Sequence, residues 1–376
     1  MLRYSTAGES HGKCLVIGIE GVPYGTPFPL DAINAELARR QGGYGRGARM
    51  KLETDAAEAL AGVRQGHTLG SPLVLQVANR VQNSEQLGPI TKPRPGHADL
   101  PGAQKFDLRD ARDVAERSSA RETAARVAAG AFAAAFLSHF GVRVLGYVVE
   151  IGGLAGERRI EDPDELVRVR DASPFYTLDP SLDERIRVRV DETRKAGDTI
   201  GGVFEVRVLG APPGLGSHAS WEDKLDGALA RALMSVQTVK AVEVGLGMES
   251  ARRPGSEFHD EIVRGEAGGL RRSRNNAGGI EGGMTNGEPV VLRAASKPIP
   301  TLRKGLRTVD LRTGEPATAQ YERSDVCVVP AASVVGQAVA AFEIAREFLR
   351  KFGGDTFDET RARYEAYRKR PEPFAP

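Results

Sequence analysis

The chain has 376 residues, of which 40% are apolar, enough to build a large hydrophobic core. Its 52 basic and 50 acidic residues leave a formal net charge of +2, which argues against a protein that coats nucleic acid or an anionic membrane. Cys14 and Cys327 provide neither a disulfide framework nor a metal-binding spacing, and no apolar run approaches the ~20 residues of a membrane span. Because the N-terminus also lacks an apolar signal region, we expect a cytoplasmic protein.

The first hundred residues predict short elements separated by irregular segments. β-type runs at Lys13–Glu20 and Ser71–Ala78 predict two strands. Between them, Asp31 is expected to cap a helix at Ala32–Arg40, which the following glycine pair ends. The stretch from residue 89 to residue 101 is rich in proline and glycine and predicts an irregular loop.

A long alanine-rich segment, Asp107–Phe140, predicts a helix that carries two unusual charges. At about 100° per residue, Arg117 and Arg121 fall on the same stripe as Val114 and Phe132. A buried unpaired charge is costly, so two guanidinium groups on an apolar stripe imply buried anions. These anions are either the carboxylates of internal ion pairs or groups of a bound ligand, and the helix alone leaves both alternatives open.

The chain after Phe140 predicts four strands and two helices. The strands are expected at Val142–Ile151, Arg185–Val190, Thr199–Leu209 and Glu288–Ala295. The helices are expected at Trp221–Met234, after an N-cap at Ser220, and from an N-cap at Ser333 to about Phe352. The charged, proline-rich tail from about residue 362 is expected to be mobile.

No linker divides the chain, so we expect one α+β domain over residues 1–376. The strands do not alternate regularly with helices, which argues against a doubly wound parallel sheet. Residues 7–23 and 281–300 each contain a glycine-rich loop, a strand and an exit interrupted by proline. This likeness suggests an internal pseudo-repeat.

Three motifs come close to familiar patterns. GESHG (Gly8–Gly12) fits the G-x-S-x-G nucleophile elbow, but that elbow needs a helix after it, and here a strand follows. A serine hydrolase stays open as an alternative, which predicts that Ser10→Ala abolishes activity and that a fluorophosphonate labels Ser10. GESHGKC is one residue short of a P-loop, and GLGMES lacks the third glycine of a dinucleotide-binding fingerprint.

Two of the six histidines lie in glycine-flanked loops among polar neighbours, as a general acid or base would. His11 belongs to GESHG, and His97 lies in RPGHAD beside Arg94 and Asp99. The remaining histidines lack such neighbours and are interpreted as structural; they are His67, His139, His218 and His259.

Arginines gather in the same loops. Arg40 and Arg46 flank GGYG, Arg94 precedes His97, and Arg323 lies near Asp325. Because guanidinium groups bind phosphate and carboxylate through paired hydrogen bonds, this grouping suggests a pocket for such anions. An RNA-binding module that uses GYGRGARM is a further alternative and predicts salt-sensitive RNA binding. The low aromatic content of 6% counts against it.

Seven blocks in order resemble the chorismate synthase family over nearly the whole chain. The blocks are GESHG, RRQGGYGRGARM, RPGHADLPG, RSSARETAARVAAGA, RSRNNAGGIEGGMTNG, KPIPT and ERSDVCVVPA. The resemblance implies a β-α-β sandwich with helices between two four-stranded sheets, and a homotetramer. It also favours ligand anions over an internal ion pair for the two helix arginines, with Arg117 meeting FMN and Arg121 meeting the substrate.

The resemblance implies a reaction as well. Chorismate synthases convert 5-enolpyruvylshikimate 3-phosphate to chorismate by an anti-1,4-elimination of the 3-phosphate and a 6-hydrogen. The family requires reduced FMN, with NADPH as a direct or indirect source of electrons. The chain shows no obvious reductase segment, so a separate flavin reductase is expected.

The family's motifs transfer catalytic roles to three residues of this chain. His11 would protonate the leaving phosphate, and His97 would stabilise negative charge on the reduced flavin. Asp325 would help to relay the proton from the flavin N5.

Binding roles follow from the same motifs. The residues implied to contact the substrate are Ser10, Arg40, Arg46, Arg94, Ser119, Arg121 and Arg323, and the family associates Arg40 and Arg46 with NADPH as well. The residues implied to contact FMN are Arg117, Ser118, Ser119, Gln237, Thr238, Gly282, Lys297, Pro298, Ile299, Pro300, Thr301 and Arg323. Thr238 departs from the family pattern, in which a smaller residue is common.

Overall fold

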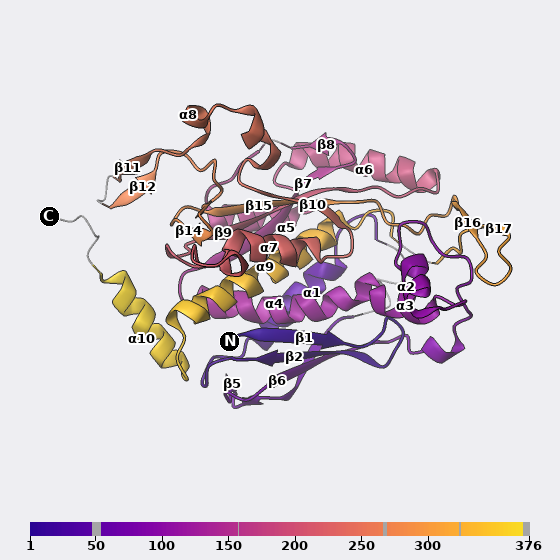
Figure 1. Ribbon diagram of the computed structural model, residues 1–376, viewed down its shortest axis with the longest axis horizontal. Helices are drawn as coiled ribbons and strands as arrows, with labels where there is room; N and C mark the ends of the chain where they lie inside the picture. The colour runs from indigo at the N-terminus through magenta and orange to yellow at the C-terminus, as the bar shows by residue number, and fades with distance from the viewer. Residues whose placement is uncertain (47–53, 157, 266–268, 323–324, 371–376) are drawn as a thin grey trace.

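Two antiparallel sheets enclose a layer of helices (Figure 1). The structure, a computed structural model, describes residues 1–46, 54–156, 158–265, 269–322 and 325–370. The first sheet has the strand order β1 (Arg3–Ala7), β2 (Cys14–Glu20), β6 (Leu73–Ala78) and β3 (Ala57–Ala61). The second has the order β10 (Val239–Val244), β15 (Val290–Ser296), β9 (Gly202–Leu209), β7 (Arg143–Ile151) and β8 (Leu154–Ala155).

Each sheet buries one face against the helices, because apolar residues alternate along its strands. In β2, Leu15, Ile17 and Ile19 are fully buried, while their neighbours in the strand are partly exposed. Ile17 pairs with Leu75 of β6 in the same antiparallel ladder. Both sheets contribute to one continuous hydrophobic core.

The helical layer consists of α1 (Leu30–Gln41), α4 (Thr123–Ser138), α7 (Leu225–Met234) and α9 (Val329–Phe352). α4 faces the first sheet and α9 faces the second. The two helices approach closely at Gly130, where a β-carbon would lie 2.2 Å from the carbonyl oxygen of Ala338. Only glycine fits at this crossing.

The other elements surround this sandwich. The helices are α2 (Asp99–Phe106), α3 (Arg112–Ser118), α5 (Pro163–Ala172), α6 (Pro180–Lys195), α8 (Gly255–Phe258) and α10 (Phe357–Arg368). The 3-10 turns are η2 (Ser84–Gln86), η3 (Ala120–Glu122), η4 (Trp221–Asp223) and η5 (Gly247–Arg252). The two-stranded pairs are β4 (Val63–Arg64) with β5 (His67–Thr68), β11 (Ile262–Arg264) with β12 (Leu270–Arg272), β13 (Ile280–Glu281) with β14 (Met284–Thr285), and β16 (Arg307–Val309) with β17 (Pro316–Thr318).

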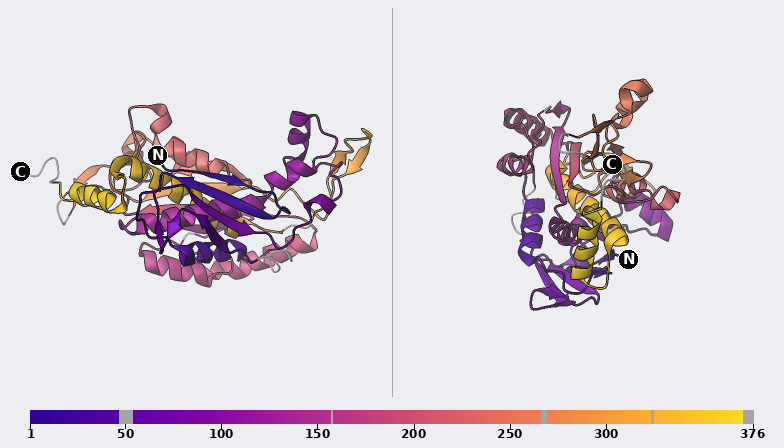
Figure 2. Two further views of the ribbon diagram at one scale, coloured as in Figure 1. Left: turned by 90° about the horizontal axis from the view of Figure 1, so that it is seen from below. Right: turned by 90° about the vertical axis from the view of Figure 1, so that its left-hand side faces the viewer.

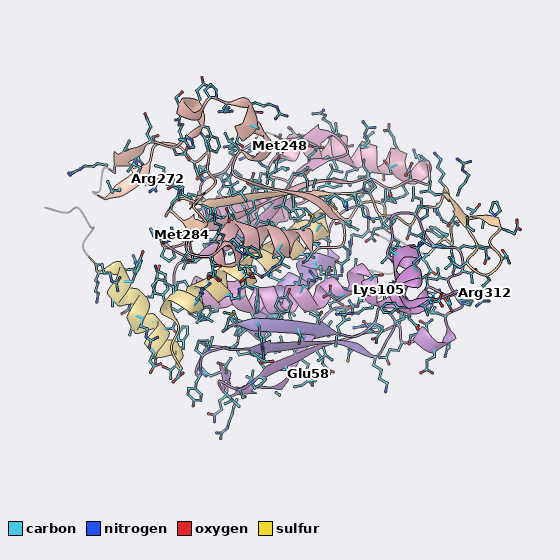
Figure 3. All side chains as sticks on the ribbon, in the orientation of Figure 1. Glu58, Lys105, Met248, Arg272, Met284 and Arg312 are labelled. Atoms are coloured by element: carbon cyan, nitrogen blue, oxygen red, sulfur yellow. The ribbon has the colours of Figure 1, made fainter. Side chains whose placement is uncertain are left out.

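One end of the molecule carries a small lobe, which we call the end lobe: α2, α3, the β16–β17 hairpin and residues 88–98. It projects beyond the sheets (Figures 1 and 2). The end lobe has an apolar cluster of its own, in which Ile90 and Ala111 are fully buried and Leu311 packs against them. Lys105 and Arg312 mark this end in Figure 3, whereas Arg272 and Met284 lie toward the opposite end.

The predicted sandwich is confirmed, with one addition. The two-residue strand β8 pairs with β7 and extends the second sheet to five strands. β2 and β15, which carry the proposed pseudo-repeat, are each the second strand of their sheet. The duplication itself stays a prediction. None of the described helices is both long enough and apolar enough to cross a membrane.

The helix predicted at Asp107–Phe140 is not one continuous helix, so this prediction is wrong. Asp107 has φ 53°, a left-handed conformation that ends α2, and a new helix, α3, then runs from Arg112 to Ser118. Ser119 has an extended ψ of 143°, so its backbone interrupts the helix, and its side chain accepts a hydrogen bond from the backbone N–H of Arg121. α4 begins only at Thr123.

The predicted strand at Arg185–Val190 is also wrong, because these residues lie inside α6. The sequence RIRVRV alternates as a strand would. However, Ile186 and Val190 are fully buried one helical turn apart, while Val188 is half exposed. Asp179 caps the helix, and Pro180 follows at its first position.

Helix starts account for further differences. α2 begins at Asp99, inside the segment predicted as a loop, and the helix predicted at Trp221–Met234 is a 3-10 turn followed by α7 from Leu225. α1 begins at Leu30, so Asp31 lies in its first turn and does not cap it. α9 begins at Val329, and Ser333 is buried within it. α10, which a capping box between Thr356 and Glu359 stabilises, extends to Arg368 within the tail predicted to be mobile from about residue 362. Residues 371–376 of this tail lie outside the described residues, and its mobility stays a prediction.

Candidate functional site

A cavity of about 810 Å³ opens where α1 ends, α9 begins and β10 and β15 meet the end lobe. Its volume is toward the upper limit of the roughly 300–1,000 Å³ typical of ligand pockets. The predicted site residues that line it are Ser10, Arg40, Arg46, Arg94, His97, Ser118, Ser119, Arg121, Gln237, Thr238, Lys297, Ile299, Pro300, Thr301 and Asp325. The fold therefore brings together segments that are far apart in the sequence.

Four predicted site residues do not line this cavity: His11, Arg117, Gly282 and Pro298. Arg323 lies outside the described residues. Gly282 forms the turn between β13 and β14, beside Met284, which Figure 3 places toward the end opposite Lys105 of the end lobe. The roles that the resemblance implies for these residues stay predictions.

Arg121 takes part in an internal ion pair, one of the two alternatives that the sequence left open. Its Nη1 lies 2.5 Å from Oδ1 of Asp55, and its Nε donates to Asn79. Arg40 approaches the other oxygen of the same carboxylate at 3.4 Å. The Asp55 side chain is completely buried, and burial lowers the pKa of Arg40 to about 10, although Asp55 opposes this shift.

Both arginines nevertheless line the cavity. Arg40 also donates to Thr123 Oγ1 and to the carbonyl oxygen of Ala120. One carboxylate between two guanidinium groups leaves a net positive charge beside the cavity. The ion pair and an anionic ligand are therefore compatible, since Asp55 fixes the arginines without neutralising both.

Arg121→Ala is expected to destabilise the fold by about 3–5 kcal/mol, because among the described residues it leaves the buried Asp55 carboxylate with only the more distant Arg40 as an ion-pair partner. Denaturant unfolding measures this change in the free energy of unfolding. Arg3→Ala is the matched control, since Arg3 and Glu20 form an exposed pair whose removal should cost at most about 1 kcal/mol. If both variants lost the same small amount of unfolding free energy, the burial of Asp55 would not require its ion pair with Arg121.

Arg117 does not face inward, so that prediction is wrong. The side chain is exposed and donates to the carbonyl oxygens of Gly8 and Thr6. The break at Ser119 is the reason, because the prediction placed Arg117 and Arg121 on one continuous helix. Arg117 instead ties the end of α3 to the end of β1 and the following loop.

His11 pairs with a buried carboxylate. Its Nδ1 lies 2.9 Å from Oε1 of Glu116, and its backbone N–H donates to the other oxygen. Burial alone would raise the pKa of Glu116, but the hydrogen bonds and charge from His11 outweigh burial and lower it. Ser10, the neighbour of His11, accepts a hydrogen bond from Ser119 and lines the cavity.

The loop that carries Ser10 and His11 is a hairpin between β1 and β2. A nucleophile elbow and a P-loop each require a helix after the loop. This topology removes the structural basis for both near-matches, including the serine hydrolase alternative.

His97 and Arg94 share a carboxylate within the end lobe. Arg94 Nε and Nη2 lie 2.7 and 2.9 Å from the two oxygens of Asp99, and His97 Nδ1 lies 2.5 Å from Oδ1. Asp99 is fully buried, whereas His97 and Arg94 border the cavity. The carboxylate thus holds an imidazole and a guanidinium group side by side at the cavity wall.

Three buried polar atoms of the cavity lining have no hydrogen-bond partner among the described residues: Gln237 Oε1, Thr238 Oγ1 and Arg46 Nε. The Gln237 amide is oriented by Glu122, which accepts a hydrogen bond from its Nε2. Arg46 is paired through Nη1 with Asp325 at 2.9 Å. Buried polar groups are normally satisfied, so these atoms indicate a polar ligand.

The buried carboxylates Asp55, Glu116 and Glu122 were absent from the sequence-based site. Each supports a predicted site residue through a long-range contact, across 66 residues for Asp55 and 105 for Glu116. Several further lining residues were also missed: Arg194, Asp198, Thr199, Arg303, Tyr321 and Glu322. The glycine-flanked stretch GDTIGG, at residues 197–202, was the available signal for two of them.

Comparisons with known proteins agree on one family. A family model described as chorismate synthase matches residues 2–349. The chorismate synthase of Geobacter sulfurreducens is 54% identical over 386 aligned positions, covering 98% of each chain. That of Geobacter metallireducens is 55% identical over 386 positions, with the same coverage. A solved crystal structure of chorismate synthase is 43% identical, has a TM-score of 0.81 and covers 97% of each chain.

Proposed function

Because the chain belongs to the chorismate synthase family of carbon–oxygen lyases, we propose that it converts 5-enolpyruvylshikimate 3-phosphate to chorismate and phosphate. The reaction is an anti-1,4-elimination. The C3–O bond to phosphate and the C6–H bond break, and the electrons of the C6–H bond become part of the new diene. No net oxidation occurs, although reduced FMN is required.

One observation carries this proposal: four of the predicted arginines and His97 converge on a single cavity, which Arg194 and Arg303 line as well. The substrate bears a phosphate and two carboxylates, and guanidinium groups bind such anions through paired hydrogen bonds. The arginines are Arg40, Arg46, Arg94 and Arg121. A net +2 chain with this concentration of positive charge at one site fits a small polyanion better than a nucleic acid.

The lining residues fit a flavin as well as the substrate. Gln237 Oε1 and Thr238 Oγ1 are buried without partners among the described residues, and FMN has hydroxyl and ring N–H groups that donate hydrogen bonds. The residues that would hold FMN are Ser118, Ser119, Gln237, Thr238, Lys297, Ile299, Pro300 and Thr301. When bound, reduced FMN supplies transient electron density that eases the departure of phosphate.

The chain's own residues would then stabilise the developing charges and transfer the protons. The arginines orient the substrate and offset the charge of the departing phosphate. His11, whose Nδ1 contacts Glu116, supplies a proton to that phosphate. His97 offers positive charge beside the reduced ring, and the Asp325 carboxylate, held by Arg46, receives the proton lost from the substrate.

Several properties of the family extend the proposal. We propose NADPH as the ultimate electron source, a separate flavin reductase, one domain over residues 1–376, a homotetramer and a cytoplasmic location. Arg40 and Arg46, which both line the cavity, are the positions proposed for NADPH.

Anaerobic turnover tests the proposal. Purified protein with reduced FMN and 5-enolpyruvylshikimate 3-phosphate is expected to release one phosphate for each chorismate formed. Omitting FMN, or supplying only oxidised FMN, should abolish release. Phosphate release that continues without reduced flavin, or RNA binding without any turnover, would contradict the proposed function.

A further inference from the structure

Asp99 is a fully buried carboxylate that contacts both His97 and Arg94. Its two oxygens lie within hydrogen-bond distance of four nitrogen atoms. The backbone N and the Nε of Arg94 lie 3.0 and 2.7 Å from Oδ2. Arg94 Nη2 and His97 Nδ1 lie 2.9 and 2.5 Å from Oδ1.

The backbone is shaped for this arrangement. Gly96 has φ +81°, a left-handed conformation that favours glycine, and the backbone N–H of His97 bonds back to the carbonyl oxygen of Arg94. This turn places Arg94 and His97 on the same carboxylate. Asp99 itself begins α2, where the helix dipole favours a negative charge.

The charge state of Asp99 follows from its partners. Burial alone would raise the pKa of Asp99, but hydrogen bonds from Arg94 and His97 outweigh burial and lower the pKa below its usual range. An ionised carboxylate only accepts hydrogen bonds. The proton in the short contact with His97 therefore belongs to Nδ1 of the imidazole.

We propose that Asp99 is a positioning residue that fixes the Nδ1–H tautomer of His97 and so leaves Nε2 to meet the ligand in the cavity. His97 borders the cavity, and its Nδ1 is held by Asp99. Nε2 then accepts a hydrogen bond when the ring is neutral and donates one when the ring is charged. The inference deepens the proposed function, because it assigns the nitrogen of His97 that acts there.

Nuclear magnetic resonance of ¹⁵N-histidine-labelled protein tests the tautomer without any ligand. At a pH where the ring is neutral, the wild-type spectrum is expected to show the proton of His97 on Nδ1. In Asp99→Asn, the amide can donate to Nδ1, so the proton is expected to move to Nε2. A wild-type Nε2–H tautomer, or a proton position that Asp99→Asn does not change, would overturn the proposal.

Kinetics provide the second readout. Asp99→Asn is expected to lower kcat by on the order of 10²- to 10⁴-fold, up to the roughly 10⁴-fold loss seen when the Asp of a Ser-His-Asp triad becomes Asn. Asp110→Asn is the matched control in the same lobe: Asp110 accepts from two backbone N–H groups through one oxygen, which Asn retains. It should keep wild-type kcat.

Asp99 also contacts Arg94, so its substitution could lower kcat through His97 or through Arg94. A double-mutant cycle separates these two effects. If Asp99 acts on kcat through His97, Asp99→Asn should add almost nothing to the loss in kcat caused by His97→Ala. An equal loss of kcat in both backgrounds would show that Asp99 acts through Arg94 or through the fold. If the proposed function fails, wild type is inactive as well, but the tautomer measurement still decides the role of Asp99.

Discussion

His97→Ala is expected to lower turnover by on the order of 10²- to 10⁴-fold, the range typical when an acid–base or charge-stabilising group is removed. The fold should survive this change, because Asp99 keeps three hydrogen bonds from Arg94. The cavity would lose its imidazole but retain its arginines. We therefore expect kcat to fall much more than substrate affinity, measured anaerobically with reduced FMN.

The matched control for this prediction is His218→Ala. His218 lies in an exposed loop and is not part of the cavity lining. It should leave kcat unchanged. A loss below about threefold for His97→Ala would remove His97 from the chemistry, since acid–base groups contribute far more.

His11→Ala is expected to reduce turnover by on the order of 10²- to 10⁴-fold, because the departing phosphate would lose its proton donor. His11 differs from His97 in its position: it pairs with Glu116 and lies next to the cavity-lining Ser10. A structural role for the His11–Glu116 pair is therefore the competing explanation. Alanine alone does not distinguish the two.

His11→Asn distinguishes them. Its side-chain amide can donate to Glu116 in place of Nδ1, but it cannot act as a general acid. If His11 is the proton donor, Asn should be as inactive as Ala. If Asn restores wild-type kcat, His11 only anchors the loop between β1 and β2.

Local patterns predicted one α+β domain and the arginines and histidines of the glycine-rich loops, whereas the sandwich was implied by the resemblance. The alternating strands and the glycine-rich loops can be seen in short windows of sequence. The resemblance then supplied residues such as Gln237 and Thr238, which no local pattern distinguishes. Both line the cavity, although their contacts with FMN stay predictions.

The errors arose where local patterns compete. RIRVRV has the alternation of a strand, yet Asp179 and Pro180 start a helix whose buried positions are Ile186 and Val190. In the predicted long helix, Ser119 takes an extended conformation that no helix propensity reveals. This one residue moves Arg117 to the surface while Arg121 stays buried.

The carboxylates Asp55, Glu116 and Glu122 could not be predicted, since their partners lie far away in the sequence. Asp55 meets Arg121 across 66 residues, and Glu116 meets His11 across 105. For the same reason, the sequence could not decide whether the helix arginines bind internal carboxylates or a ligand. Arg121 does both: it binds Asp55 and lines the cavity.

The central claim is that one cavity holds the substrate and reduced FMN together. An anaerobic crystal structure with both ligands tests it most directly. We predict both molecules in the 810 Å³ cavity, with substrate anions on Arg40 and Arg121 and with Gln237 Oε1 and Thr238 Oγ1 hydrogen-bonded to FMN. FMN bound elsewhere on the chain, or a cavity that takes only one of the two ligands, would contradict the account.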